Sequence, residues 1–364
     1  GVQTCALPIC SGNASCGKCK VKLVAGEMNS PKTRHISDDE YAEGWRLACV
    51  SKLTGDVEVQ VPDIASAYRS RMKVADLSSR EEIAIFEQAK SDVEAAGITL
   101  KNSLDIIHVK MDEPTLDDTM PDNERLIRAI KRDTGVQRVR LPYSALRKIS
   151  VVFRENHFDV QCIVRRTADD IFVYDVYGRN EKVVIGGLAI DIGTTTVSAL
   201  LINMQTGEIL GKASAGNGQI RYGADVINRI IESMKPGGSE KLQNAVVDET
   251  INPMIEQMCR SCGFSPLHIY RMCIASNTTM NHLLTGMNGD PIRMEPYIPT
   301  FYKTNSLFAS DIGIRVNPDA HIILAPNIGS YVGGDITAGT LVSMLWNRPE
   351  FSLFIDLGTN GELV

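Results

Sequence analysis

Apolar and polar residues alternate in two short stretches near the start of the chain, at residues 20–24 and 55–61. A period of two residues is typical of strands that bury one face and expose the other. The sequence therefore predicts two half-buried strands in this part of the chain.

The pattern changes after residue 62, because residues 65–80 carry scattered charge and no sustained apolar period, as a linker would. An amphipathic helix is predicted next, since Ser79 and Glu82 form a capping box before apolar residues at helical spacing, and Gly97 ends the run. A second helix is predicted at residues 122–132. Strands are predicted at residues 150–153, 158–164 and 171–176. No catalytic set assembles here, so we expect a small α+β domain whose charged runs form a solvated face.

A strand, a tight polar turn and a second strand are predicted at residues 188–202, where Asp191, Gly193 and three threonines separate two apolar runs. An acidic residue at the end of a strand can hold Mg²⁺ through water, and glycine lets backbone N–H groups approach phosphate oxygens. The threonine hydroxyl groups add further donors. The sequence therefore predicts a polyphosphate site at this turn.

The same Asp-x-Gly-Thr pattern returns at Asp356, again after an apolar strand, and continues through Gly358 and Thr359 to Glu362. One such pattern could be an ordinary hairpin, whereas two at matching positions suggest related subdomains that face a single nucleotide. We therefore expect a nucleotide site between two lobes.

Three further polar clusters lie at the edges of apolar elements, at residues 217–229, 275–282 and 333–335. Taken singly, these clusters have structural explanations. Asp225 would cap a helix, and His282 would be a hydrogen-bonded residue of the core.

The composition is that of a globular protein, because 43% of the 364 residues are hydrophobic and 23% are charged. This length predicts two or three domains. A net charge of -6 gives no general attraction to nucleic acids or anionic membranes, and no apolar run approaches the roughly 20 residues that span a bilayer. We therefore expect a cytoplasmic protein that binds neither nucleic acid nor membrane.

Four of the nine cysteines, Cys10, Cys16, Cys19 and Cys49, have the spacing C-x5-C-x2-C-x29-C, with glycines in the first loop. Glycine allows a loop to curve around a cluster with its N–H groups turned toward the sulfur atoms. A structural zinc site is the alternative, but zinc usually takes two C-x2-C pairs about 12 to 20 residues apart. The spacing favours an iron–sulfur cluster in a reducing compartment.

The later cysteines have structural interpretations. Cys259 and Cys262 form a second C-x2-C, which we interpret as a helix end, although a redox or metal role stays open. Cys162 and Cys273 lie in apolar runs and are expected in the core.

Both ends of the chain have unusual features. Residues 1–9 resemble the translation of a sequencing adapter, so Cys5 is expected to have no role. The chain stops at Val364 within a predicted strand and turn. We therefore interpret it as a fragment cut at both ends.

The cysteine spacing followed by strands resembles the plant-type and adrenodoxin-type ferredoxins, with one extra residue between the first two cysteines. The two Asp-x-Gly-Thr turns resemble those of the actin, hexokinase and Hsp70 ATPase superfamily. With the motifs Gln-x-x-Tyr-Gly-Ala-Asp-Val and Asn-Thr-Thr-Met-x-His, the series over residues 10–364 is similar to the reductive activators of corrinoid enzymes, also described as an ASKHA or DUF4445 family.

This resemblance implies a multidomain protein of the α/β and α+β classes. It implies a β-grasp ferredoxin domain, a small α+β connecting domain and an actin/Hsp70-like (ribonuclease H-like) ATPase domain. With 1–9 set aside, the expected boundaries are 10–62 for the ferredoxin domain, 63–105 for a linker with a helix, 106–185 for the connecting domain and 186–364 for the ATPase domain.

The resemblance also implies roles for single residues. The four clustered cysteines would hold a 2Fe-2S cluster. The residues expected to approach the phosphates of ATP are Gly193, Thr194, Thr195, Gly358, Thr359 and Asn360. The residues expected to assist Mg²⁺ in a catalytic role are Asp191, Asp335 and Asp356.

The implied function is ATP-dependent reduction of Co(II) to Co(I) in a partner corrinoid protein of a methyltransferase system, with electrons from an upstream low-potential donor. Two alternatives stay open. One is a ferredoxin-like electron carrier or redox sensor with a vestigial ATPase lobe, which the intact phosphate loops disfavour. The other is an ATP-driven electron donor to another iron–sulfur enzyme, which the ferredoxin cysteines disfavour. A homodimer also stays open.

Overall fold

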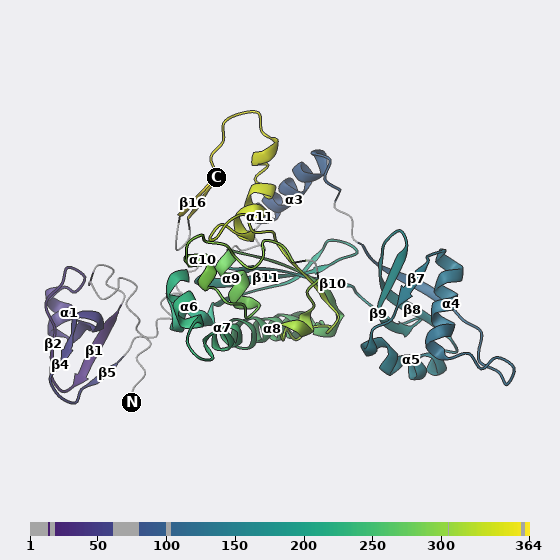
Figure 1. Ribbon diagram of the computed structural model, residues 1–364, viewed down its shortest axis with the longest axis horizontal. Coiled ribbons are helices and arrows are strands. Elements are labelled where there is room, and N and C mark those ends of the chain that lie inside the picture. The colour runs from purple at the N-terminus through teal and green to yellow at the C-terminus, as the bar shows by residue number, and fades with distance from the viewer. Residues whose placement is uncertain (1–13, 15–18, 61–79, 100–102, 305, 358–360) are drawn as a thin grey trace.

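The computed structural model describes residue 14 and residues 19–60, 80–99, 103–304, 306–357 and 361–364. These residues form three units (Figure 1). In the sequence, the helix α3 (Arg80–Ala95) lies between the first unit and the second. The connecting unit that follows α3 lies on one side of the last unit, and the N-terminal unit lies on the other side (Figure 1). The protein is therefore a mixed α/β protein of several domains.

The N-terminal unit is built on a three-stranded antiparallel sheet in the order β3-β1-β5. Its strands are β1 (Lys20–Ala25), β3 (Trp45–Leu47) and β5 (Glu58–Gln60). Both predicted strands are confirmed, although the described part of the second is shorter than expected. The unit is completed by β2 (Met28–Asn29), β4 (Lys52–Leu53), α1 (Asp38–Ala42) and the 3-10 helix η1 (Ala48–Val50).

Local chemistry explains where α1 begins. The Ser37 hydroxyl accepts a hydrogen bond from the Glu40 N–H, and the Glu40 carboxylate accepts one from the Ser37 N–H, which is a capping box. The small core of this unit contains Cys19, Ile36 and Leu47. Cys19 is therefore part of the hydrophobic core from which β1 starts.

Helix α3 occupies the range predicted for an amphipathic helix. Gly97 has a φ of +88°, a conformation that favours glycine, and it lies just after the helix end as predicted. The helix packs against α11 (Gly334–Val342) of the last unit (Figure 1). Ser79 of the predicted capping box and the predicted linker up to that residue lie outside the described residues.

The connecting unit is a four-stranded sheet in the order β6-β8-β9-β7 with two helices. Neighbouring strands are antiparallel except β7 and β9, which are parallel. The elements are β6 (Leu104–Lys110), α4 (Asp122–Thr134), β7 (Arg138–Arg140), α5 (Tyr143–Glu155), β8 (Asp159–Arg166) and β9 (Asp170–Gly178). The helix predicted at 122–132 and the strands predicted at 158–164 and 171–176 are confirmed.

The strand predicted at residues 150–153 is wrong, because these residues lie inside α5. Ala145, Ile149 and Phe153 are buried at helical spacing, whereas Val151 is exposed. The run of β-branched and aromatic residues favours a strand locally, but burial of one helical face outweighs that propensity.

The last unit contains a five-stranded sheet in the order β12-β11-β10-β13-β14. Only β11 runs antiparallel to the other four strands. The strands are β10 (Gly186–Ile192), β11 (Thr196–Asn203), β12 (Ile209–Gly216), β13 (Ile269–Ser276) and β14 (His321–Leu324). The strand, turn and strand predicted within residues 188–202 are confirmed.

Helices α7 and α8 lie along one face of this sheet (Figure 1), and the largest core fills the space between them and the strands. The helical elements are η2 (Gly218–Tyr222), α6 (Val226–Ser233), α7 (Gly238–Val246), the π-helical turn η3 (Val247–Ile251), α8 (Asn252–Cys262), η4 (Pro266–His268), α9 (Thr278–Leu284), α10 (Asp290–Arg293), η5 (Ala309–Asp311), α11 and η6 (Leu345–Asn347). A hairpin of β15 (Ile355–Leu357) and β16 (Gly361–Leu363) follows. Among the described helices, none combines the length and apolar character that a bilayer crossing requires.

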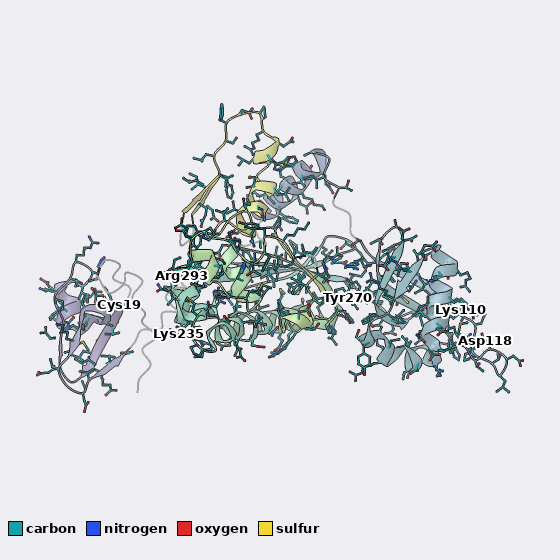
Figure 2. All side chains as sticks on the ribbon, viewed as in Figure 1. Cys19, Lys110, Asp118, Lys235, Tyr270 and Arg293 are labelled. Carbon is teal, nitrogen blue, oxygen red and sulfur yellow. The ribbon has the colours of Figure 1, made fainter. Side chains whose placement is uncertain are left out.

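A polar cluster joins the connecting unit to the last unit around Tyr270, which Figure 2 labels between them. The Tyr177 hydroxyl donates to the Asp175 carboxylate at 2.5 Å, and the Tyr270 hydroxyl lies 2.8 Å from that of Tyr177. Lys148 forms an ion pair with Asp175. Apolar residues from both units pack around Tyr270. The two units therefore meet through a hydrogen-bonded, largely apolar contact.

Candidate functional site

Two of the four predicted cluster ligands lie among the described residues, and the fold brings them together. Cys19 is 1% exposed in the N-terminal unit (Figure 2), and Cys49 lies in η1. The Cys49 N–H donates to the Cys19 sulfur at 3.5 Å, and the Ala48 N–H donates to the Cys19 carbonyl at 2.9 Å. Cys10 and Cys16 lie outside the described residues.

The surroundings of Cys19 fit a ligand of an iron–sulfur cluster. A backbone N–H directed at the sulfur stabilises a thiolate, and hydrogen bonds to cluster sulfurs are one of the means by which proteins tune such centres. The apolar core around Cys19 shields the sulfur from water. Within the described ranges, no three His, Cys, Asp or Glu residues form a group that could hold a metal ion. The structure therefore supplies two of the four thiols and a suitable environment for one of them.

Two predictions about the cysteines outside the first unit are confirmed: the core position of Cys162 and the helix end at Cys259 and Cys262. Cys162 is buried in β8, where burial raises the pKa of its thiol to about 12. Cys259 and Cys262 lie at the end of α8, which Gly263 terminates with a φ of +66°. Burial and then the neighbouring Cys262 raise the pKa of Cys259 to about 11. The C-x2-C pair is therefore a helix end.

The core position predicted for Cys273 is wrong, because this residue is exposed on β13. Its neighbours Met272 and Ile274 are both buried. Successive side chains of a strand point to opposite faces, so burial of these neighbours turns Cys273 away from the main core.

The predicted polyphosphate turn lies between β10 and β11, directly after Asp191. The Gly193 N–H donates to the Thr196 carbonyl at 2.8 Å and closes the turn. Asn217, which follows β12, holds the turn from behind. Its side-chain amide donates to the Gly193 carbonyl at 2.9 Å, and its backbone N–H donates to the Thr195 carbonyl at 2.8 Å. The conformation of the turn is therefore fixed by a residue from a distant part of the sequence.

Three parallel strands end at the same edge of the sheet as this turn. The carboxyl ends of β10, β13 and β14 meet there, so the starts of α9 and α11 are neighbours of the turn. Gly333 makes the approach of α11 close, because a Cβ atom on it would lie 2.4 Å from the Ser276 carbonyl oxygen. Asp335, in the first turn of α11, is thereby placed at the edge that Asp191 occupies.

The three carboxylates predicted to be catalytic influence one another electrostatically. Asp191 reaches solvent at the edge of the sheet, and partial desolvation of its carboxylate, followed by the negative charges of Asp335 and Asp356, raises its pKa to about 6. Burial and the charge of Asp356 also raise the pKa of Asp335, against the opposite effect of backbone N–H groups. Glu362 joins this group, because burial and the charges of Asp356 and Asp335 raise its pKa.

The structure thus gathers Asp191, Asp335, Asp356 and Glu362 into one negatively charged group. Among the described residues, no three of these carboxylates are close enough to ligate one ion directly. Mg²⁺ usually keeps several waters and takes only one or two carboxylates, so this looser arrangement suits a hydrated magnesium ion. Asp356 in β15 pairs with Glu362 in β16, and the predicted phosphate contacts Gly358, Thr359 and Asn360 lie outside the described residues.

The remaining polar clusters have the structural roles that were predicted. Asp225 caps α6, because its carboxylate accepts from the Asn228 N–H at 2.8 Å. His282 is completely buried, its Nε2 accepts from the Thr300 N–H at 3.0 Å, and its Nδ1 lies 2.8 Å from the Thr278 carbonyl. Burial lowers the pKa of His282, so the imidazole is a neutral, hydrogen-bonded core group.

Two residues of the site received no role from the sequence. Glu362 extends the carboxylate group, and Arg229 lies behind the turn with no exposed surface, where its guanidinium donates to the Thr194 carbonyl. The sequence pattern could have identified Arg229, because helical spacing places it on the same buried face of α6 as Val226 and Ile230. An arginine among the buried positions of an amphipathic helix indicates an internal partner.

Three protein families match the chain, in an order that follows its units. Residues 3–54 match the 2Fe-2S iron-sulfur cluster binding domain. Residues 93–182 match the RACo linker region, and residues 186–348 match the RACo middle region. The N-terminal match supports the cluster chemistry inferred at Cys19 and Cys49.

Known proteins are similar to the chain over different lengths. The corrinoid activation enzyme RamQ of Eubacterium limosum is 34% identical over 224 residues, which are 61% of this chain and 37% of RamQ. A solved structure of a reductive activator for corrinoid, iron-sulfur protein has a TM-score of 0.63 and 32% identity, and the match covers 98% of this chain and 56% of that one.

A third relative matches only the N-terminal unit. This relative is one component of the Na(+)-translocating NADH-quinone reductase of Mannheimia succiniciproducens, and it is 41% identical over 56 residues, which are 15% of this chain and 14% of that component. The chain spans about half the length of the solved activator and just over a third of RamQ. The chain therefore carries, in order, regions similar to a 2Fe-2S iron-sulfur cluster binding domain, the RACo linker region and the RACo middle region.

Proposed function

We propose that this protein is an ATP-dependent reductive activator of the cytoplasm. It passes a low-potential electron from an upstream donor to a corrinoid protein of a methyltransferase system and reduces the cobalt from Co(II) to Co(I). The proposal depends chiefly on one observation: Cys19 and Cys49 meet in a 2Fe-2S domain that shares a chain with the carboxylate-lined turn at Asp191. The names of two relatives, both activators for corrinoid proteins, support the choice of substrate.

The cysteines at positions 10, 16, 19 and 49 are the proposed cluster ligands. A bound 2Fe-2S cluster of the plant type supplies one-electron transfer at about −400 mV. The core formed by Cys19, Ile36 and Leu47 keeps water from one side of this site. The N–H of Cys49 stabilises negative charge on the Cys19 sulfur, so the protein contributes both shielding and a hydrogen bond.

The last unit is the proposed ATPase lobe of actin/Hsp70-like (ribonuclease H-like) fold. The strand order β12-β11-β10-β13-β14, with only β11 antiparallel, supports this assignment. The proposed phosphate contacts are Gly193, Thr194, Thr195, Gly358, Thr359 and Asn360. The proposed Mg²⁺ residues, which act through bound water, are Asp191, Asp335 and Asp356.

Nucleotide binding can drive the electron step only if it favours one conformation of the protein over another. An electron transfer that is uphill by about 0.2 V needs roughly 5 kcal/mol. We propose that ATP and Mg²⁺ draw the Asp191 turn and the β15–β16 hairpin together, because a cation relieves the repulsion within the carboxylate group. The closed form would dock differently on the corrinoid partner and make the transfer effectively one-way.

The test is an anaerobic single-turnover reaction of the reduced protein with a cob(II)amide corrinoid protein, followed by the absorbance of Co(I). The expected result is a higher Co(I) yield with MgATP than with MgADP or without nucleotide. Equal yields would contradict the coupling and favour a simple electron carrier. Reduction of a separate iron–sulfur enzyme, with no Co(I) formed, would favour the second alternative.

A matched pair of variants links this result to the site. Asp191→Asn removes a proposed Mg²⁺ residue, and we expect it to lose the ATP-dependent part of the Co(I) yield. Asp117→Asn removes an exposed carboxylate from the connecting unit and should behave as the unmodified protein does. Equal ATP dependence in all three proteins would contradict the assignment of Asp191.

A further inference from the structure

Arg229 is a fully buried arginine whose hydrogen-bond acceptors are all neutral. Its Nε donates to the Gly223 carbonyl at 2.8 Å, and its Nη1 donates to the Gln219 side-chain oxygen at 3.2 Å. Its Nη2 donates to the Thr194 carbonyl in the predicted polyphosphate turn. Nη1 also lies 3.2 Å from the Met280 sulfur. The guanidinium therefore contacts the turn without a carboxylate in the same network.

The charge of Arg229 persists despite its burial. Burial lowers the pKa of this guanidinium to about 9, against the opposite influence of Asp225, so the group is a cation at neutral pH. The Asp225 carboxylate bonds instead to the backbone and side-chain amides of Asn228, at 2.8 and 2.7 Å. Arginine is almost never fully buried without a paired anion, because the lost hydration is costly. A negative charge near Arg229 would therefore be stabilised.

The hydrogen bonds behind the turn also determine which way its peptide groups point. The Gly193 carbonyl accepts from Asn217, and the Thr194 carbonyl accepts from Arg229. In a planar trans peptide the C=O and the following N–H point in opposite directions. With both carbonyls held toward the protein interior, the N–H groups of Thr194 and Thr195 are directed to the other side of the turn. That side is where a phosphate would lie.

We propose that Arg229 is a positioning residue for polyphosphate, which orients the peptides of the turn from behind and supplies a buried positive charge that bound phosphate compensates. This inference rests on the proposed nucleotide function. It assigns part of the affinity of the turn for phosphate to Arg229, which does not touch the phosphate itself. The expected ligand class is a magnesium-bound polyphosphate. The hydrogen bond of Arg229 acts on the turn that would hold phosphate, and it makes no use of the nucleoside part of a nucleotide.

The test is calorimetric titration of the protein with MgATP and with magnesium tripolyphosphate. Arg229→Met keeps an unbranched stem about as long as the aliphatic part of arginine and removes both the charge and the hydrogen bonds. We expect it to weaken binding of both probes by roughly 10- to 100-fold, which is the range for loss of a hydrogen bond to a charged group. The matched control is Arg221→Met, because Arg221 is partly exposed and paired with Glu249 at 2.6 Å. The control should stay within about twofold of the unmodified protein.

Two conservative variants separate positioning from a general loss of structure. Arg229→Lys retains the charge without the planar fork and should recover part of the affinity. Gln219→Glu places a carboxylate beside Arg229 while the arginine stays in place, so a fully folded protein should still lose affinity and should show a weaker dependence of binding on salt.

The outcomes distinguish this inference from the proposed function. If the unmodified protein binds neither probe, the proposed nucleotide site is contradicted. If it binds both and folded Arg229→Met binds them equally well, the role of Arg229 is overturned while the nucleotide site stands. If Arg229→Met does not fold, Gln219→Glu decides, and an unchanged affinity with unchanged salt dependence overturns the inference.

Discussion

Asp191 and Asp335 lie together at one solvent-accessible edge of the central sheet, where partial desolvation and then the negative charge of Asp335 raise the pKa of Asp191 to about 6. The two residues are distant in the sequence, and they meet because β10 and β14 are parallel members of one sheet. Their repulsion is a property of the cation-free protein. Binding of Mg²⁺ would remove it, so the same arrangement that costs stability favours a ligand.

The first prediction is that Asp191→Asn stabilises the protein at neutral pH when no cation is present. The folded state holds a proton on Asp191 up to about pH 6, whereas the unfolded chain releases it near the ordinary value of 3.8. The raised pKa therefore makes the unmodified protein lose stability as the pH rises from about 4 to 6. In EDTA, the variant should have the higher Tm at about pH 7.5 and an equal Tm near pH 4. Thermal unfolding followed by circular dichroism measures this difference.

The control for this experiment is Asp117→Asn, which lies in an exposed part of the connecting unit. Its Tm should match that of the unmodified protein at both pH values. Addition of Mg²⁺ and ATP should raise the Tm of the unmodified protein and leave that of Asp191→Asn almost unchanged. A variant that is less stable than the unmodified protein in EDTA at the higher pH would contradict the electrostatic account.

The second prediction concerns the contact between the connecting and last units. Lys148→Met leaves the buried Asp175 without its cation, although the Tyr177 hydroxyl still donates to it at 2.5 Å. Removal of one partner from a buried pair typically costs several kcal/mol, but Lys148 is 37% exposed and the Tyr177 hydrogen bond remains, so we expect about 2 kcal/mol. The urea midpoint of unfolding, followed by tyrosine fluorescence, should fall accordingly.

Lys110→Met provides the comparison for that variant. Lys110 is 62% exposed and lies 3.9 Å from Asp159, so its loss should cost less than about 0.5 kcal/mol. Equal midpoints for the two variants would show that Lys148 contributes no more than a surface lysine does.

The third prediction separates the cysteines by their reactivity. Burial raises the pKa of Cys162 to about 12 and is the main cause that raises the pKa of Cys259 to about 11, so neither forms much thiolate at about pH 8. Cys262 and Cys273 are exposed. Brief treatment with iodoacetamide at this pH, read by peptide mass spectrometry, should label Cys262 first, label Cys273 more slowly because partial desolvation raises the pKa of its thiol, and spare Cys162 and Cys259. Fast labelling of Cys162 would mean that the connecting unit opens readily.

Sequence patterns predicted the elements in which local and long-range preferences agree. The alternation at β1 and the apolar runs around Asp191 were sufficient, because in each case the residues that favour a strand also have one face to bury. Residues 150–153 were mistaken for a strand, because their local propensity conflicts with the helical burial of Ile149 and Phe153. Cys273 was misplaced because an apolar run does not reveal which of its members face the core.

The site was predictable in its chemistry and less so in its geometry. Cysteine spacing indicated the pair Cys19 and Cys49 without any knowledge of the fold. The grouping of Glu362 with the aspartates and the position of Arg229 behind the turn depend on strand order and helix packing. Such contacts join residues that no local pattern relates, so they require the three-dimensional structure.

We propose that the four thiols at positions 10, 16, 19 and 49, of which Cys19 and Cys49 are in contact, hold a two-iron centre through which the electron passes. The decisive measurement is the electron paramagnetic resonance spectrum of the anaerobically reconstituted, dithionite-reduced protein, with iron and sulfide analysis. We predict two irons per chain and a 2Fe-2S signal in the unmodified protein and in Cys262→Ser, with loss or strong alteration of the signal in Cys19→Ser. A zinc-filled or iron-free unmodified protein, or an unchanged signal in Cys19→Ser, would contradict this account.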